Sequence, residues 1–371
     1  EKTQITSSST MPTPSSSSSS EIIRSSTKPL LRAEDIIHRS YQRTFGALSI
    51  ETACSLDVDG RTCIDSLLSE VRELSSSSSQ TSQNNDEAPS TKATTTSTSF
   101  PWWFVTMLRD IKANGGIHGA WHNLTILDPP MDFCTIEKIA TTQWRNVQCS
   151  LNEGKEAIWN SRPCQLDRTK LASRNRSDVS RVVMLRDPLE RLLSGYLNKC
   201  ADGRRRKIEG SCEPMSVFDE TDMTLRIRED PKQLFAAYVD GFPLKWDMHF
   251  FPQSMYCDLL FRHVDDYDFV GRMDQGFYGQ LRNMTSKFGG GSRLSEAFDK
   301  VFDLSFRLSV GRGNGNVGTE TQALKHVNKY FTAASVRRAL EYFAVDYIRL
   351  GLEIPGWVDD ILEEENEMFA D

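Results

Sequence analysis

The segment RVVMLRDPLERLLSGY, residues 181–196, restricts the fold of this chain more than any other stretch. Its apolar run ends on Arg-Asp-Pro, and apolar residues then recur at helical spacing. This pattern predicts a buried strand followed directly by a helix from Pro188 to about Lys199. FCTIEKIA and TTQWRNVQCSL, within 133–151, repeat this order, and DYDFVGRM (266–273) predicts another strand. The alternation predicts an α/β fold with a central parallel sheet flanked by helices, in which ligands bind at the carboxyl ends of the strands.

Polar tracts divide the chain into four parts. Ser, Thr, Pro and small polar residues dominate 7–20 and 75–99, and such tracts cannot bury enough apolar surface to offset the entropy of ordering. The segments LRAEDIIHRSYQRTF and CIDSLLSEVREL between them carry helical apolar spacing. The predicted parts are a disordered Ser-rich stem (1–28), a small helical stem module (29–74), a disordered Ser/Thr-rich linker (75–99) and a main domain (100–371).

The cysteines and glycosylation sequons favour the lumen of the secretory pathway. Eight cysteines show no CxxC pair and no metal-ligand spacing, so we expect disulfides and no bound metal. One disulfide can staple the stem module, where Cys54 and Cys63 flank a turn. The pairing of Cys257 is open, with Cys200 and Cys212 as candidates. The N-x-S/T sequons lie at Asn123, Asn175 and Asn283.

Charge and hydropathy narrow the range of partners. The formal charge of −7 argues against nucleic acid as a ligand. A local basic excess over residues 170–207 suits either an anionic ligand or a solvated face. No apolar run reaches the length of a membrane span, and no signal peptide is visible. The chain starts on Glu1 and is Ser/Thr-rich there, as expected after a removed anchor, so we expect membrane attachment only through an anchor that this chain lacks.

The segment IEKIATTQWRNV, residues 136–147, has the pattern of an anion-binding turn. A strand that ends at Lys138 or Ile139 and turns through Ala140 into a helix presents unpaired backbone N–H groups to an anion. The segment lacks the glycines and the GK[ST] ending of a nucleoside-triphosphate loop, which disfavours a kinase or an ATPase. Taken alone, it can equally be an ordinary strand-to-helix turn.

Arg186 and Ser194 form the second candidate site. Arg186 follows the strand RVVML, and Ser194 lies two helical turns further along the chain. A guanidinium and a hydroxyl so placed can hold one phosphate, because the planar fork of arginine binds two oxygens at once. The alternative is that Arg186 pairs with Asp187 or Glu190.

Four segments, in this order, resemble the Golgi carbohydrate sulfotransferases related to chondroitin 4-O- and HNK-1 sulfotransferases. EKIATTQWRNV resembles the family's PKVACTNWKRV, which binds the 5′-phosphosulfate of PAPS (3′-phosphoadenosine 5′-phosphosulfate). LRDPLERLLSGY resembles VRHPFERLVSAY, which binds the 3′-phosphate. MHFFPQSMYC with DDYDFVGRMD (248–274) and LEYFAVDYIRLGL (340–352) resemble H-x-x-PQ-x-x-x-C with DYDFVGKFE and LYxLDFxLFGY. The likeness covers roughly 133–352 and implies a P-loop-like, PAPS-dependent sulfotransferase catalytic domain at 100–371.

The resemblance implies roles for the residues of the first turn. Lys138 would contact the phosphosulfate, and the turn through Ala140 would bring the amides and hydroxyls of Thr141 and Thr142 around it. Arg145 would be a further candidate for contact with the phosphosulfate. Trp144, in the same segment, is expected to be a core aromatic that closes the helix onto the sheet.

The resemblance also implies that Arg186 and Ser194 bind the 3′-phosphate. This sequence departs from the family pattern at Glu137, which stands where the family has proline, and at Thr141 and Gln143, which replace Cys and Asn. Glu137 either places a carboxylate beside the anion and weakens donor binding, or points away from it on the opposite face of a strand.

Sulfuryl transfer requires a base for the acceptor's proton and a cation for the leaving oxygens. Lys138 is the candidate for the cation. His249 is the first candidate for the base, because a neutral imidazole works near neutral pH; the alternative is a buried histidine that only supports the site. Asp247 and Glu137 are second choices.

The expected function is therefore transfer of a sulfuryl group from PAPS to a carbohydrate hydroxyl, in the Golgi lumen, by a single-pass type II membrane protein in its full-length form. The run RRRK (204–207) can line a groove for an anionic polysaccharide, or it can be a solvated loop. The alternatives are sulfation of protein tyrosine and a binding protein that keeps the fold without turnover.

Overall fold

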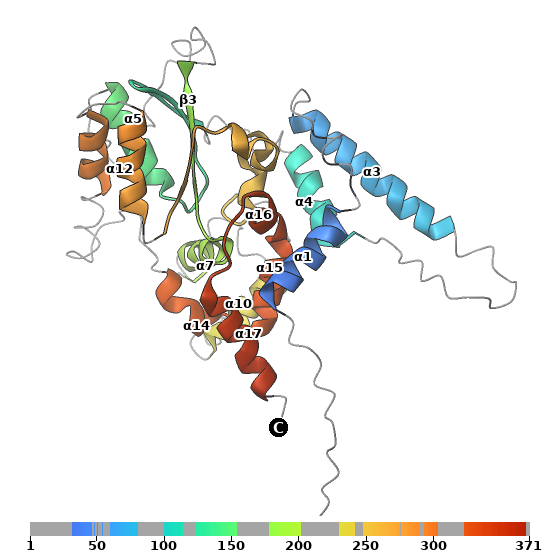
Figure 1. Ribbon diagram of the computed structural model, residues 1–371. Coiled ribbons are helices and arrows are strands. Elements are labelled where there is room, and N and C mark those ends of the chain that lie inside the picture. The colour runs from blue at the N-terminus through green and yellow to red at the C-terminus, as the bar shows by residue number, and fades with distance from the viewer. Residues whose placement is uncertain are drawn as a thin grey trace, which may run out of the picture. The chain divides into compact units, whose positions relative to one another are not determined.

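The fold is described from a computed structural model of the chain (Figure 1). Residues 31–371 form one compact unit, and the unit assigned to 1–30 lies wholly outside the described residues. The described residues are 32–46, 48, 50, 54, 60–80, 100–113, 123–153, 178–201, 230–241, 248–274, 276–288, 293–302 and 323–368.

The strands are β1 (Asn123–Leu127), β2 (Pro130–Cys134), β3 (Ser180–Leu185) and β4 (Phe269–Arg272). The α-helices are α1 (Ala33–Thr44), α3 (Gly60–Gln80), α4 (Trp102–Ala113), α5 (Thr141–Glu153), α7 (Pro188–Lys199), α10 (Pro231–Asp240), α11 (Tyr256–Leu259), α12 (Phe277–Lys287), α14 (Val327–Tyr330), α15 (Ala333–Tyr342), α16 (Ala344–Arg349) and α17 (Gly356–Met368). Short 3-10 turns are η3 (Gln253–Met255), η4 (Leu260–Arg262), η5 (Val264–Asp266) and η6 (Ala323–His326), and 293–302 are also helical.

The sheet has the order β1-β2-β3-β4, and β2, β3 and β4 run parallel. The register places Phe133 opposite Val182 and Val182 opposite Phe269. The predicted α/β fold with helices around a mostly parallel sheet is confirmed (Figure 1). The sheet is not parallel throughout, because β1 pairs antiparallel with β2 through a tight turn at Asp128 and Pro129.

The first predicted strand ends earlier than expected. β2 stops at Cys134, and residues 135–140 form a turn in place of a strand that runs to Lys138 or Ile139. Lys138 and Ala140 have left-handed φ values of 70° and 54°, which a strand cannot accommodate. Glu137 therefore lies in this turn and has no strand face to define its direction.

The predicted stem module is packed into the same core as the main domain. α1 lies against α15 and α16 (Figure 1), and the Ser40 hydroxyl donates to the Glu341 carbonyl over 2.8 Å. Phe45 contacts Phe104 and Phe261 edge-on. The boundary predicted at residue 100 therefore does not separate two hydrophobic cores.

The predicted linker and the polar stem are mostly outside the described residues. α3 continues to Gln80, into the tract predicted to be a linker from residue 75, and the Ser75 hydroxyl donates to the Val71 carbonyl over 2.7 Å. Serine is only mildly unfavourable in a helix that preceding apolar residues already anchor. Residues 1–28, 81–99 and 204–207 lie outside the described part of the chain.

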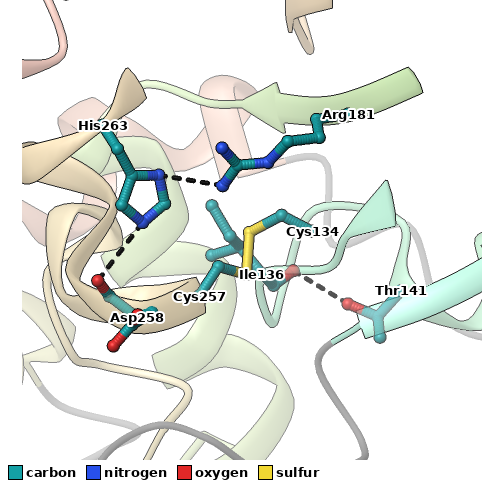
Figure 2. Close-up of a disulfide and its surroundings, with 7 residues drawn as sticks. All are labelled: Cys134, Ile136, Thr141, Arg181, Cys257, Asp258 and His263. Carbon is teal, nitrogen blue, oxygen red and sulfur yellow. Dashed lines mark hydrogen bonds between the residues drawn. A yellow bond between two sulfur atoms is a disulfide. The ribbon is translucent and has the colours of Figure 1, made fainter. Parts of the chain in front are cut away.

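The disulfides confirm one expectation and correct another. Cys54 pairs with Cys63, as a staple of the stem module requires. Cys257 pairs with Cys134 and not with Cys200 or Cys212 (Figure 2). Cys134 ends β2, and left-handed backbone at 257–259 turns the Cys257 side chain toward it. A separation of 123 residues along the chain hid this pair from sequence reasoning.

Candidate functional site

Two predicted loops meet at the carboxyl edge of the sheet. The turn 135–140 follows β2 and leads into α5, and residues 186–187 follow β3 and lead into α7. Because β2 and β3 are parallel neighbours, both loops leave the sheet at the same edge. The Arg186 guanidinium Nη1 donates to the Lys138 carbonyl over 3.3 Å. Sequence reasoning placed Lys138 and Arg186 in one site, and the fold brings their loops into contact.

The first loop presents backbone to a ligand. The Trp144 amide donates to the Ala140 carbonyl over 3.0 Å, which starts α5. The amides of Thr141, Thr142 and Gln143 precede that bond, and no described residue accepts from them. Unpaired amides at the start of a 13-residue helix carry partial positive charge and suit an anion.

The hydroxyl of Thr141 has a different role from the one that the resemblance implies. It donates to the Ile136 carbonyl over 2.8 Å and is buried, so its proton is committed to the turn (Figure 2). Thr141 therefore offers an anion its amide and not its hydroxyl proton. Thr142 is half-buried at the same helix end.

The second loop presents a side chain. The Arg186 side chain is 14% exposed, and its Nε lies 3.6 Å from Glu190 Oε2, so the pairing considered from the sequence does form. Burial lowers the pKa of Arg186 and raises the pKa of Glu190. Nη2 of Arg186 has no acceptor among the described residues, and it remains available to an anion.

Asp187 does not form the alternative ion pair. Its carboxylate accepts from the Glu190 amide over 2.8 Å and from the Tyr347 hydroxyl over 2.8 Å, which caps α7. Burial raises the pKa of Asp187 to about 7. Ser194 is buried two turns further along α7.

His249 lies beside the first loop. Its Nε2 is 3.8 Å from Glu137 Oε2, and Arg145 Nη2 is 3.7 Å from Glu137 Oε1. Of the two directions considered for Glu137, the structure has the carboxylate facing the predicted site residues. The fold therefore brings together Glu137, Lys138, Arg145, Arg186 and His249 from separate segments.

Arg191 is the first functional residue that sequence reasoning missed. It is completely buried, and its guanidinium donates to the carbonyls of Glu137 (2.9 Å), Phe251 (2.6 Å) and Met248 (3.2 Å). Glu137 precedes Lys138, and Met248 precedes His249, so one side chain fixes the backbone before both candidate catalytic residues. The signal in the sequence was an arginine on the apolar face of the predicted helix.

Gln253 and Asp346 support the second loop and were also missed. The Gln253 side chain accepts from the Arg186 amide (3.0 Å) and donates to the Arg186 carbonyl (2.7 Å). The Asp346 carboxylate accepts from the amides of Gln253 and Ser254, each over 2.8 Å. The available signal was an aspartate within the otherwise apolar segment FAVDYI.

The remaining expectations are settled only in part. Trp144 is buried and its ring packs against Phe133 and three further phenylalanines, which confirms the core role. Asp247 lies outside the described residues.

Across the described ranges, no group of three or more His, Cys, Asp and Glu side chains could hold a metal ion. None of the helices in the described part of the chain has the length and apolar character to cross a bilayer.

The fold and the two loops define an α/β protein with a candidate anion-binding site at the carboxyl edge of its sheet. The sequence profile of the sulfotransferase family matches residues 122–347, a range that contains both loops and His249. The chain belongs to this family, whose members transfer sulfuryl groups. No curated protein and no solved structure shows significant similarity to the chain.

Proposed function

We propose that the protein transfers the sulfuryl group of PAPS to a hydroxyl of a carbohydrate, with the donor held between the two loops. The observation that carries the proposal is the contact of the Arg186 guanidinium with the Lys138 carbonyl. This contact supports the proposal because one ligand with an anionic group at each end could then reach both the Arg186 side chain and the open N-terminus of α5.

The residues present fit such a donor. The open amides of Thr141, Thr142 and Gln143 suit the 5′-phosphosulfate, and the available Nη2 of Arg186 suits the 3′-phosphate, with buried Ser194 on the same helix. Bound PAPS supplies an activated sulfuryl group and a phosphate leaving group. Lys138 and Arg145 would contribute positive charge next to the phosphosulfate.

His249 is the proposed proton acceptor for the attacking hydroxyl. Its imidazole lies beside the first loop, which is the side where the sulfuryl group would be held. Arg191 donates to the carbonyls of Glu137 and Met248, and so fixes the backbone directly before Lys138 and directly before His249. Orientation of the reacting groups and removal of the hydroxyl proton are the main contributions that this site can make to the rate.

The carbohydrate acceptor and the Golgi lumen are part of the proposal. They are supported by the resemblance to Golgi carbohydrate sulfotransferases and by disulfides at Cys54–Cys63 and Cys134–Cys257, which suit an oxidising compartment. An anionic polysaccharide and attachment through a type II membrane anchor belong to the same proposal. A protein tyrosine acceptor and donor binding without turnover are the competing outcomes.

An acceptor screen tests the proposal. The protein is incubated with PAPS and a panel of glycans, neutral and anionic, and with tyrosine peptides, and products are detected by mass spectrometry. We expect a gain of one sulfuryl group on a glycan. Sulfation of the peptides alone would replace the carbohydrate acceptor. PAP binding by calorimetry without any product would identify a binding protein, and no PAP binding would overturn the donor assignment.

A further inference from the structure

We propose that Glu137 is a positioning residue that orients His249 and stabilises its protonated form during transfer. The inference rests on the proposed function and names a residue that the family pattern does not supply. In this reading Arg145 holds the other carboxylate oxygen of Glu137, so Arg145, Glu137 and His249 act as one chain of charges.

The two carboxylate oxygens of Glu137 have different partners. Oε1 lies 3.7 Å from Arg145 Nη2, and Oε2 lies 3.8 Å from His249 Nε2. Both separations exceed the length of a hydrogen bond, so these are electrostatic contacts. Catalytic hydrogen bonds are often long before substrate binds and shorten in the complex.

Burial strengthens these contacts. The Glu137 side chain is 16% exposed and the His249 side chain is 20% exposed, so solvent screens their interaction only in part. The more exposed end of the chain of charges is Arg145, whose side chain is 37% exposed. A carboxylate so placed offsets the positive charge that develops on the imidazole during proton transfer from the acceptor.

The backbone holds Glu137 and His249 at this separation. Arg191 donates from Nε to the Glu137 carbonyl and from Nη2 to the Met248 carbonyl, directly before His249. Gly195 on α7 allows the His249 segment to pack closely, because an added Cβ there would lie 2.6 Å from the Phe250 ring and 3.3 Å from the His249 carbonyl. The carboxylate–imidazole pair is thus set by a buried guanidinium and a close helix contact.

The acceptor O–H proton passes to the His249 imidazole, the acceptor oxygen forms a bond to sulfur, and the bond from sulfur to the bridging oxygen breaks. The electron pair of that broken bond stays on the phosphate of the leaving nucleotide. Glu137 takes no proton in this step and only offsets the charge of the imidazolium.

A competing reading assigns Glu137 to donor affinity, since a carboxylate beside an anion site repels the donor. The two readings predict opposite results for Glu137→Gln. If Glu137 positions His249, kcat falls by about 10- to 100-fold while the Kd for PAP changes by less than about 3-fold. If it only repels the donor, PAP binds more tightly and kcat is unchanged.

The experiment compares wild type, Glu137→Gln, His249→Ala and the double variant, with Glu341→Gln as the matched control. Glu341 also pairs with an arginine, Arg338, and lies on α15, outside both loops. Calorimetry with PAP and steady-state rates with PAPS are measured for all of them. We expect Glu137→Gln to cost less than about 3-fold in the His249→Ala background, because its effect acts through the imidazole. An equal loss in both backgrounds would overturn the proposal.

A second readout does not depend on transfer. Selective ¹⁵N labelling of histidine gives signals from only six residues, and the His249 signal is assigned from His249→Ala. We expect Glu137→Gln to move the imidazole ¹⁵N shifts of His249 and Glu341→Gln to leave them in place. Unmoved shifts would overturn the pairing. Moved shifts in a protein that does not bind PAP would retain the pairing and overturn the donor site instead.

Discussion

The two loops at the carboxyl edge of the sheet present positive charge by different means. The first loop, 135–140, presents backbone amides, because the left-handed residues Lys138 and Ala140 leave the start of α5 open. The Thr141 hydroxyl that follows it donates to the Ile136 carbonyl within the turn. The second loop, 186–187, presents a side chain: the Arg186 guanidinium donates to the Lys138 carbonyl, while Asp187 caps α7. Neighbouring strands of one sheet thus support one site through backbone dipoles and through a guanidinium.

Because of this contrast, the two loops are sensitive to different substitutions. Backbone amides survive most side-chain changes, so the first loop is vulnerable chiefly through its conformation. An arginine site fails when that one side chain is removed. The second loop also carries the Asp187 carboxyl group, whose pKa is raised by burial, and its stability is therefore sensitive to pH.

Replacement of His249 should separate the chemical step from donor binding. His249 lies beside the first loop, with its Nε2 3.8 Å from Glu137 Oε2. We expect His249→Ala to lower kcat by about 100-fold or more and to leave the Kd for PAP within about 3-fold. Steady-state kinetics and calorimetry measure the two quantities. A loss of folding, seen by circular dichroism, would instead make His249 a structural residue.

The pH dependence of stability distinguishes the second loop. Burial raises the pKa of Asp187 from 3.8 to about 7, so the folded state favours the protonated carboxyl. This contribution to stability is present at low pH and is lost as pH rises toward and through 7. We expect Asp187→Asn to gain about 2 kcal/mol relative to wild type between pH 5.5 and pH 8, in urea unfolding. A difference that does not change with pH would contradict the assignment.

The conformation of the first loop depends on the Thr141 hydroxyl. Thr141→Val removes the hydrogen bond to the buried Ile136 carbonyl and should cost about 1–2 kcal/mol in the free energy of unfolding. Thr142→Val, at the half-buried neighbour, serves as the matched control and should cost less. Equal losses in thermal denaturation would show that the Thr141 hydrogen bond does not maintain the turn.

Backbone strain at Ala140 should have a small effect on the free energy of unfolding. Ala140 has a φ of 54°, a region that glycine adopts without steric cost. We expect Ala140→Gly to raise the free energy of unfolding by up to about 1 kcal/mol. Ala237→Gly in α10 is the control and should lower it by about 1 kcal/mol, since this alanine is helical. Destabilisation by both changes would argue that Ala140 is unstrained.

Local signals in the sequence were enough for the strand–helix units. The apolar run before Arg186 and the proline at position 188 gave β3 and α7 their observed limits, because Asp187 and Pro188 form a helix start by themselves. β1 was missed because it pairs with β2 through a tight turn that contains two prolines, and prolines do not indicate a strand pair. The strand at β2 was predicted to extend too far because apolar spacing does not reveal the left-handed residues Lys138 and Ala140.

The supporting residues of the site could not be predicted from local patterns. Arg191 and Asp346 act through contacts with segments 54 to 93 residues away in the sequence. The sequence showed only a charged residue on an apolar helix face, and this pattern does not predict which segment that residue contacts. The motifs located the two loops, while the network that joins them required the fold.

The most direct test of the account is a calorimetric titration of wild type and Arg186→Ala with PAP and with adenosine 5′-monophosphate, which lacks the 3′-phosphate. Arg181→Ala is the matched control, because this arginine lies at the opposite end of β3 and contacts His263 (Figure 2). We predict that wild type and Arg181→Ala bind PAP about 100-fold more tightly than the monophosphate, and that Arg186→Ala binds both equally weakly. An Arg186→Ala variant that keeps the preference for PAP would contradict the assignment of the second loop.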